Sequence, residues 1–284
     1  MPVAVIDIGT NTTRLLVAEV EDGQVVELER RTIITSLGQG VDASGRLAQE
    51  AMDRVAEAIA VYREVIDRLG AERVVALATS AMRDAENGPE FRDYLRKRFG
   101  IEPRTISGDE EARLTFLGAT SERNDDRETL VIDIGGGSTE YVVGRPGHDP
   151  EFHVSTQMGS VRFTERFEDL EEMGAAVRDT VPDVSVEQGI AVAGTATSLA
   201  AIDGADPIHG YRLSLATCER LVAMLAAMPL EERRRVKGLH PDRAPTIVAG
   251  AVILTESMRA LGLAEVEVSA RDILHGAALA AAAL

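Results

Sequence analysis

The chain has 284 residues, a formal net charge of −17, 45% hydrophobic residues and 27% charged residues. This balance is typical of a globular protein with a buried core, and the length predicts two domains. The acidic charge argues against general nucleic-acid binding, which needs a basic surface, and the single cysteine, Cys218, excludes a disulfide framework and a cysteine-based zinc site.

The N-terminal residues carry no pattern of a secretory signal. The apolar stretch at residues 2–8 is too short for one and runs directly into Asp7. No segment approaches the ~20 apolar residues that a membrane helix needs. The sequence therefore predicts a cytoplasmic protein that binds neither a membrane nor nucleic acid.

The first half of the chain predicts strands and helices in alternation. The expected strands lie near residues 3–8, 14–20, 24–35, 74–78 and 103–106. The expected helices lie near residues 46–69, 88–98 and 109–118. The polar residues 121–128 are the best candidate for a domain junction.

The second half begins with the same meander of three strands. The expected strands lie near residues 130–134, 139–144, 150–156, 190–193 and 265–268. The expected helices lie near residues 160–167, 171–180, 195–202, 214–227, 243–261 and from 271 onward. We therefore expect an α/β protein with one domain at residues 1–125 and another at 126–284, each a mixed sheet flanked by helices. The last helix is an element that could pack back on the first domain.

A duplication is the most informative feature of the sequence. The segment Val-Ile-Asp-Ile-Gly at residues 5–9 recurs at residues 131–135. Each copy predicts a buried strand, an Asp at its end, a turn of small residues and a second strand. Such a turn directs backbone N–H groups inward and lets a phosphate approach closely. Its residues are the first phosphate-binding candidates: Gly9, Thr10, Asn11, Thr12 and Arg14 in one copy, and Gly135, Gly136, Gly137, Ser138 and Thr139 in the other.

Three carboxylates accompany these turns. Asp133 and Glu140 flank the second turn and could both reach one cation, and Asp7 could add to the site through water. Mg²⁺ is the expected metal, with Mn²⁺ as an alternative, because a hard cation takes carboxylate oxygens and bridges phosphates. The alternative is that Asp7 and Asp133 only cap their own turns.

Two further segments place small or basic residues at the ends of expected strands. Gly194 and Thr195 open a helix, whose N-terminal N–H groups favour an anion. Thr79, Ser80 and Arg83 follow the strand at 74–78, at the sheet edge where ligands of α/β proteins bind. Each segment alone also fits an ordinary strand–helix turn and a surface arginine.

The segment at residues 107–114 brings three carboxylates, including Glu111, to a helix start. A favourable helix dipole with Ser107 as the N-cap explains them, and so does a carboxylate that deprotonates water for attack on phosphorus. The basic run at residues 233–237 has two interpretations as well, a solvated helix face and a path for a long anionic chain.

Taken together, these segments resemble the exopolyphosphatase and guanosine pentaphosphate phosphatase (Ppx/GppA) family. The segments that carry the resemblance span almost the whole chain: residues 5–11, 78–83, 106–114, 131–140, 158–162, 194–198 and 268–273. The resemblance implies two actin-like, ribonuclease-H-like domains with an active-site cleft between them. It also implies Mg²⁺-dependent hydrolysis of a terminal phosphoryl group.

Within that resemblance, Glu111 matches the family's proposed catalytic base and Arg83 its phosphate-binding arginine. Asp133 and Glu140 match its metal region, and Asp7, Thr10, Asn11, Gly136, Gly137 and Ser138 match its phosphate-binding loops. The chain ends where longer relatives continue into a helical region, which argues against processive handling of long polyphosphate.

The expected activity is therefore that of an exopolyphosphatase acting on inorganic polyphosphate, with guanosine pentaphosphate as the alternative substrate. An actin-like small-molecule kinase is a less favoured alternative, and a regulatory protein without catalysis is a third. The apolar helices of the second half fit a homodimer and core packing equally well.

Overall fold

The computed structural model describes residues 1–283 and divides the chain into two compact units. The first comprises Met1–Glu122 together with the C-terminal segment from Ile273, and the second is Arg123–Asp272. The sequence predicted the division at residue 125 and counted the last helix with the second half, as an element that could pack back on the first domain. In the structure that helix belongs to the first unit.

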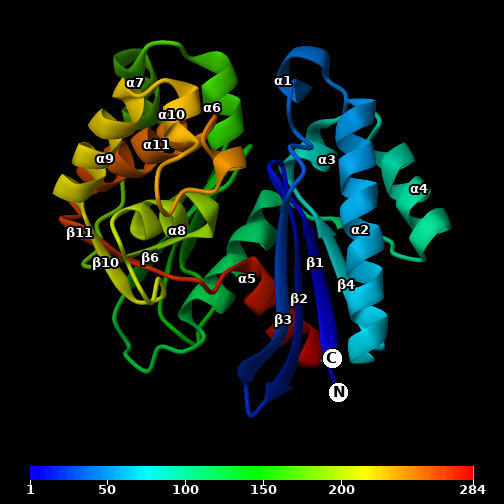
Figure 1. Ribbon diagram of the computed structural model, residues 1–284. Coiled ribbons are helices and arrows are strands. Elements are labelled where there is room, and N and C mark those ends of the chain that lie inside the picture. The colour runs from blue at the N-terminus through cyan, green and yellow to red at the C-terminus, as the bar shows by residue number, and fades with distance from the viewer. Residues whose placement is uncertain (284) are drawn as a thin grey trace. The chain divides into compact units, whose positions relative to one another are not determined.

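The first unit contains five strands and six helices among the described residues (Figure 1). In chain order they are β1 (Val3–Ile8), β2 (Thr12–Glu21), β3 (Gln24–Ile34), α1 (Val41–Ser44), α2 (Gln49–Leu69), β4 (Arg73–Ala78), α3 (Ser80–Asp84), α4 (Gly88–Phe99), β5 (Arg104–Thr105), α5 (Gly108–Thr120) and α12 (Ile273–Ala282).

The sheet of this unit has the strand order β3-β2-β1-β4-β5. β1, β2 and β3 form an antiparallel meander, while β4 runs parallel to β1, and β5 parallel to β4. Asp22 and Gly23 connect β2 to β3, and both have positive φ angles, 50° and 77°. This two-residue Asp-Gly connection matches the right-handed twist of the strands, which is why it makes a tight hairpin.

Alternate residues of β1 enter two different hydrophobic clusters, as expected for a strand with both faces buried. Ile6 and Ile8 pack with Ile59 and other apolar residues of α2. Val3 and Val5 pack with Ile273 and other residues of α12. Figure 1 shows α2 along one face of this sheet and α12 on the other.

Helix α12 also packs closely on α5. A Cβ atom on Gly276 would lie 1.8 Å from the carbonyl oxygen of Leu114, so only glycine permits this approach. One residue earlier, the fully buried His275 places Nε2 2.8 Å from Oε1 of Glu27 on β3. The last helix is therefore an integral part of the first unit.

The second unit contains six strands, six α-helices and one short 3₁₀ helix. In chain order they are β6 (Thr129–Ile134), β7 (Thr139–Gly144), β8 (Phe152–Thr156), α6 (Ser160–Arg166), α7 (Leu170–Thr180), β9 (Gly189–Val192), α8 (Ala193–Ile202), β10 (Tyr211–Ser214), α9 (Leu215–Ala227), α10 (Leu230–Arg233), η1 (Pro241–Arg243), α11 (Ile247–Ala260) and β11 (Glu265–Val268).

The second sheet has the order β8-β7-β6-β9-β11-β10, which repeats the first and adds β10 at one edge. β6, β7 and β8 are the antiparallel meander, and β9 runs parallel to β6. Apolar side chains of this sheet pack with α6, α7, α8, α9 and α11 in one continuous core. The predicted fold class, two mixed sheets flanked by helices, is confirmed.

The predicted elements agree with the observed ones to within a few residues, but five short elements were not predicted. These are α1, α3, β10, α10 and η1, each of three to five residues. No helix within residues 1–283 combines the length and the apolar composition that crossing a bilayer requires.

Candidate active site

The two duplicated hairpins have the same geometry. In the first, Asp7 lies opposite Arg14, and the Gly9 N–H donates to the Thr12 carbonyl at 2.9 Å. In the second, Asp133 lies opposite Glu140, and Gly135 donates to the Ser138 carbonyl at 3.0 Å. The turns at residues 10–11 and 136–137 are therefore equivalent, as the sequence repeat predicts.

Directly opposite residues of an antiparallel pair present their side chains on one face of the sheet. In the first hairpin this brings the Arg14 guanidinium to Oδ2 of Asp7, with Nε at 2.9 Å and Nη2 at 2.6 Å. Both side chains are largely buried. The predicted phosphate ligand and the predicted metal ligand therefore form an ion pair, and Asp7 already has a cationic partner.

In the second hairpin the opposite pair is two carboxylates. Asp133 and Glu140 are 6% and 1% exposed, and the Ser155 hydroxyl donates to Oε1 of Glu140 at 2.6 Å. Two buried carboxylates on one sheet face are hard oxygen donors of the type that Mg²⁺ takes together with water and phosphate. They fit the implied metal, although residues 1–283 contain no group of three or more His, Cys, Asp or Glu side chains arranged to hold one.

A segment that sequence reasoning missed holds the first turn in place. Ser36, which has a positive φ of 46°, donates its N–H to the Asn11 carbonyl at 3.0 Å. The Gly38 N–H donates to the Thr10 carbonyl at 2.8 Å, and a Cβ on Gly38 would lie 2.2 Å from Cγ2 of Thr10. Because both turn carbonyls are occupied, the orientation of the turn is fixed.

The second turn is held in a corresponding way. The N–H groups of Ser160 and Val161 donate to the carbonyls of Gly135 and Gly136, both at 2.9 Å. A Cβ on Gly159 would lie 2.2 Å from the Gly136 carbonyl oxygen. The buried hydroxyl of Thr139 donates to the Met158 carbonyl at 2.5 Å, so it supports the turn from inside.

The predicted segment that contains Thr79, Ser80 and Arg83 lies beside the first turn. The Thr79 N–H donates to the Ile8 carbonyl at 3.2 Å, which fixes the start of α3 at the end of β1. The ideal Cβ position on Gly9 lies 3.8 Å from Asp7 Oδ2 and 4.0 Å from Thr79 Oγ1. Asp7, Gly9 and Thr79 therefore converge at one end of the sheet, as predicted for strand ends that carry a ligand.

Arg83 and Glu111, which are 28 residues apart in sequence, are brought together. Nη1 of Arg83 lies 3.3 Å from Oε2 of Glu111, and the same nitrogen donates to the Ile106 carbonyl at 2.9 Å. Ser107 caps α5 by accepting the Glu110 N–H at 3.2 Å, so the N-cap part of the prediction is confirmed. This cap places Glu111 in the first helical turn beside the arginine.

Gly194 and Thr195 lie where β9 passes into α8, and this junction is strained. Ala193 has a positive φ of 63°, a conformation that costs a non-glycine residue about 1 kcal/mol. An ideal Cβ on Gly194 would lie 1.7 Å from Nη1 of Arg243, so the guanidinium rests directly on this glycine. Sequence reasoning did not identify Arg243, because nothing in its local pattern indicates the contact.

The basic run at residues 233–237 is not one uniform solvated face. Arg234, Arg235 and Lys237 are exposed, as the first interpretation predicts. Arg233 is half-buried and donates to the carbonyls of Leu225, Met228 and Ala244. Burial lowers the pKa of Arg233, whose part in the structure is to hold the loop after α9.

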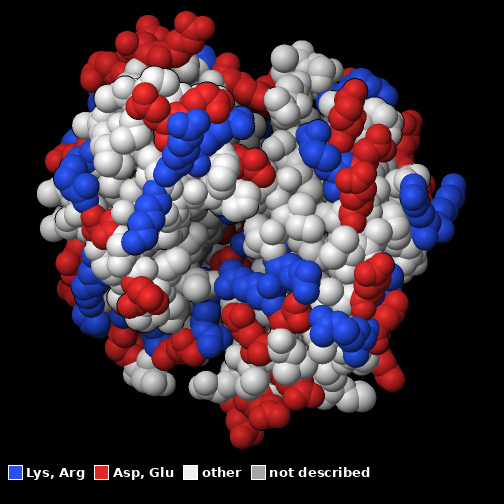
Figure 2. Space-filling view, in the orientation of Figure 1, with Lys and Arg blue, Asp and Glu red and all other residues white. Residues whose placement is uncertain are grey.

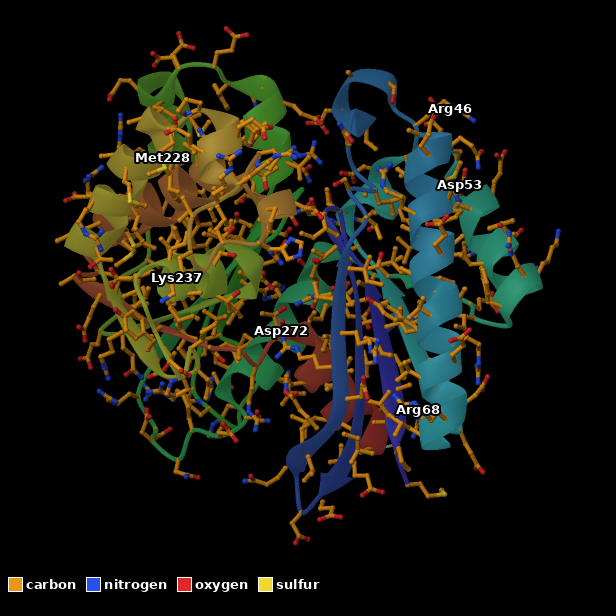
Figure 3. All side chains as sticks on the ribbon, in the orientation of Figure 1. Arg46, Asp53, Arg68, Met228, Lys237 and Asp272 are labelled. Carbon is orange, nitrogen blue, oxygen red and sulfur yellow. The ribbon has the colours of Figure 1, made fainter. Side chains whose placement is uncertain are left out.

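Charges elsewhere on the surface are intermixed, as Figure 2 shows for one face. Arginines pair with nearby acids, for example Arg104 with Glu110 and Arg212 with Glu265. Arg68 at the C-terminal end of α2 (Figure 3) pairs with Glu29 at 3.0 Å. Many arginines of this acidic protein therefore neutralise carboxylates in place.

The model of the Ppx/GppA phosphatase family matches residues 16–282. The chain belongs to this family. Among curated proteins, Exopolyphosphatase 2 of Mycobacterium tuberculosis is 37% identical, with 99% of this chain and 98% of that protein covered. Exopolyphosphatase 1 of the same species is 32% identical, with 94% of this chain and 84% of that protein covered.

Solved structures of Ppx/GppA members have the same architecture. An exopolyphosphatase-like protein is 33% identical, with a TM-score of 0.90 and 99% and 97% of the two chains covered. The Aquifex aeolicus family member is 29% identical, with a TM-score of 0.82 and 100% and 98% covered. The fold is therefore the actin-like fold of this family, and the protein is a phosphatase, a hydrolase of phosphoryl groups.

Proposed function

We propose that this Ppx/GppA protein is an exopolyphosphatase that removes the terminal phosphoryl group of inorganic polyphosphate. The observation that carries the proposal is the contact between Arg83 and Glu111, with Nη1 and Oε2 3.3 Å apart. A guanidinium that binds a phosphoryl oxygen and a carboxylate that accepts a proton from water are then adjacent. The relatives named exopolyphosphatase support the choice of polyphosphate over other phosphoanhydrides.

The reaction assigned to these residues is a displacement at the terminal phosphorus. Glu111 accepts a proton from water, whose oxygen forms a bond to phosphorus while the anhydride P–O bond breaks. The shortened polyphosphate leaves as the anion, and phosphate is released. Arg83 stabilises the charge on the phosphoryl oxygens, where most of the catalysis of phosphoryl transfer lies.

The remaining predicted site residues are assigned to binding. Backbone N–H groups of the turns at residues 10–11 and 136–137 bind substrate oxygens, and Arg14 supplies positive charge that Asp7 orients. Asp133 and Glu140 are the residues that would hold Mg²⁺ or Mn²⁺, and the metal would supply further positive charge to the phosphoryl oxygens. This assignment moves Asp7 from the metal site to the anion site, because its carboxylate already pairs with Arg14.

The test is phosphate release, in the presence of Mg²⁺, from short polyphosphate, long polyphosphate, guanosine pentaphosphate and ATP. Glu111→Gln is expected to lower turnover ~10²–10⁴-fold without preventing substrate binding, the range for loss of a general base. Glu110→Gln is the matched control, because Glu110 is the neighbouring residue and pairs with Arg104. That variant is expected to keep its activity.

Each outcome decides between the alternatives. Release from polyphosphate that Glu111→Gln abolishes supports the proposal, and faster release from guanosine pentaphosphate would move the substrate to that compound. Consumption of ATP that depends on an added acceptor would indicate a kinase instead. Full activity of Glu111→Gln would remove Glu111 from the mechanism.

A further inference from the structure

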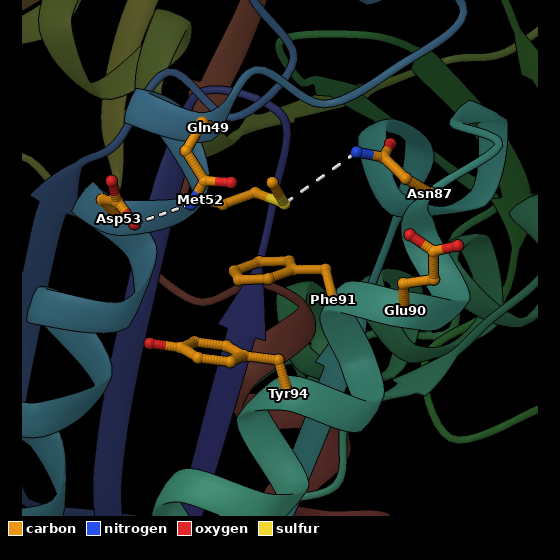
Figure 4. Close-up of a pocket in the computed structure, with 7 residues that line it drawn as sticks. All are labelled: Gln49, Met52, Asp53, Asn87, Glu90, Phe91 and Tyr94. Carbon is orange, nitrogen blue, oxygen red and sulfur yellow. Dashed lines mark hydrogen bonds between the residues drawn. The ribbon is translucent and has the colours of Figure 1, made fainter.

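A cavity of the first unit lies between α2 and α4 (Figure 4). Its volume is about 210 Å³, which is enough for a small organic ligand and less than a drug-sized molecule needs. None of the residues that line it is among those assigned to the active site. The cavity therefore has no part in the proposed phosphatase chemistry.

Aromatic and thioether groups form one side of this cavity. The rings of Phe91 and Tyr94, one turn apart on α4, are stacked with centroids 6.1 Å apart and planes inclined by 17°. Figure 4 shows the Met52 side chain extending from α2 toward Asn87, on one side of the Phe91 ring. An aromatic face attracts cations as well as apolar groups, and Arg98 already lies 5.7 Å from the Tyr94 ring centroid.

The charged residues that line the cavity are both acidic and both exposed, and the other polar lining residues are the amides Gln49 and Asn87. Asp53 of α2 and Glu90 of α4 line it, and the Gln49 side chain donates to Oδ1 of Asp53 at 2.9 Å. Across residues 1–283 neither carboxylate forms an ion pair with Lys, Arg or His, in contrast to the carboxylates of many surface arginine pairs. No basic residue lines the cavity. Two negative charges from opposite helices therefore border an aromatic surface.

We propose that this cavity binds a small organic cation, an alkylguanidinium or alkylammonium compound. The cationic group would pair with Asp53 and Glu90, and the alkyl part would lie against Phe91, Tyr94 and Met52. The combination of charge pairing with an apolar contact distinguishes this ligand class from neutral and anionic compounds of the same size.

The cavity is connected to the segments that carry the phosphate-binding residues. Asn87, which lines it, is buried and bridges both backbone groups of Leu47, accepting from N at 2.8 Å and donating to O at 3.0 Å. A Cβ on the adjacent Gly88 would lie 2.2 Å from the Met82 carbonyl oxygen, so α4 begins directly against α3. Arg83 is the next residue of α3. We therefore expect the cation to change the activity, and this step rests on the proposed function.

The binding test uses N-butylguanidinium and its neutral analogue N-butylurea, followed through the backbone amide NMR signals of Asn87 and Phe91. Butylguanidinium is expected to shift these signals saturably, and Asp53→Asn is expected to weaken its binding about tenfold. Glu57→Gln is the matched control, one turn along α2, exposed and outside the cavity. Equal binding of butylurea, or equal binding by Asp53→Asn, would overturn the proposal, and so would the absence of saturable shifts in the wild type.

An activity measurement tests the connection separately. Butylguanidinium is expected to change the rate of phosphate release at least about twofold in the wild type and not in Asp53→Asn. The variant is also the control for binding of the cation by polyphosphate, because that binding would affect both proteins equally. Saturable binding without any change in rate would overturn the connection to α3. If the wild type releases no phosphate from any substrate, the NMR shifts still decide the binding site, and only the proposed function fails.

Discussion

Arg14 directs two nitrogen atoms at a single carboxylate oxygen of Asp7, Nε at 2.9 Å and Nη2 at 2.6 Å. The corresponding positions in the second hairpin hold the two carboxylates Asp133 and Glu140. One duplicated framework therefore carries a neutralised ion pair in one unit and two negative charges in the other. This difference in charge is the reason for assigning Asp133 and Glu140, and not Asp7, to the proposed metal site.

Removal of Arg14 should destabilise the first unit. Arg14→Met leaves the charge of the buried Asp7 without its guanidinium, and breaking a largely buried ion pair costs about 3 kcal/mol. The measurement is the free energy of unfolding in urea. The double variant Asp7→Asn/Arg14→Met removes both charges and should recover much of that loss. A double variant as unstable as Arg14→Met would show that packing and not charge explains the effect.

Metal removal should separate the roles of the carboxylates. EDTA is expected to abolish phosphate release and added Mg²⁺ to restore it. Asp133→Asn and Glu140→Gln should each raise the Mg²⁺ concentration for half-maximal activity at least about tenfold, because each removes an anionic ligand. Asp7→Asn should leave this concentration unchanged. An equal shift in Asp7→Asn would return Asp7 to the metal site.

Gly38 should control the first phosphate-binding turn. Gly38→Ala places a Cβ 2.2 Å from Cγ2 of Thr10, so the turn must move. The KM for polyphosphate is expected to rise about tenfold because the backbone donors are displaced. The double variant Gly38→Ala/Thr10→Ser removes the methyl group that clashes, and the nearest remaining atoms are 3.3 Å and 3.4 Å away. If the double variant does not lower the KM from the value of Gly38→Ala toward that of the wild type, the result would count against the positioning role of Gly38.

Cys218 should be unreactive in the folded protein. Burial raises the pKa of its thiol to about 12, and the carboxylates of Asp203 and Glu219 add to the shift. In the unfolded chain the thiol has a pKa of about 8.5, so at pH 8 folding lowers the thiolate fraction about a thousandfold. Labelling with a thiol-reactive disulfide should therefore be slow in buffer and fast in denaturant. Rapid labelling of the native protein would contradict the burial of this residue.

The raised pKa of the Cys218 thiol also determines the direction in which the free energy of unfolding changes with pH. From about pH 9 to pH 12 the unfolded chain has released the Cys218 proton while the folded protein retains it. The unfolded state then binds fewer protons, so the free energy of unfolding falls as the pH rises through this range. Cys218→Ser, which lacks the titration, should show a smaller fall between pH 8 and pH 10.

Long elements and the duplication could be predicted from sequence because their signals are local. The apolar run of β1 and the helical spacing of apolar residues in α2 are visible in short windows. The strand β10 could not be predicted in this way, since its four residues form a strand only by pairing with β11 at the sheet edge. The five-residue α3 was missed for a similar reason, although its residues Ser80 and Arg83 were identified as candidates.

In the candidate site, too, local patterns could be predicted from sequence and contacts between distant residues could not. Residue types at strand ends and turns identified the phosphate-binding candidates, because glycine and hydroxyl residues beside a buried Asp have a local pattern. The contacts of Gly38 with Thr10 and of Arg243 with Gly194 join residues 28 and 49 positions apart, and only the packed structure brings them together. The family resemblance assigned Glu111 its role, and its distance from Arg83 had to come from the fold.

The position of α12 constrains the order in which the two units can complete their folding during synthesis. The apolar face of the first sheet that includes Val5 and Leu16 is covered by residues of α12, which leave the ribosome only after the whole second unit has been made. The second unit is one continuous segment and can fold while the first still lacks its closing helix. Until α12 has emerged, the first unit exposes a hydrophobic sheet face, and this is the stage at which the nascent chain most needs protection from aggregation.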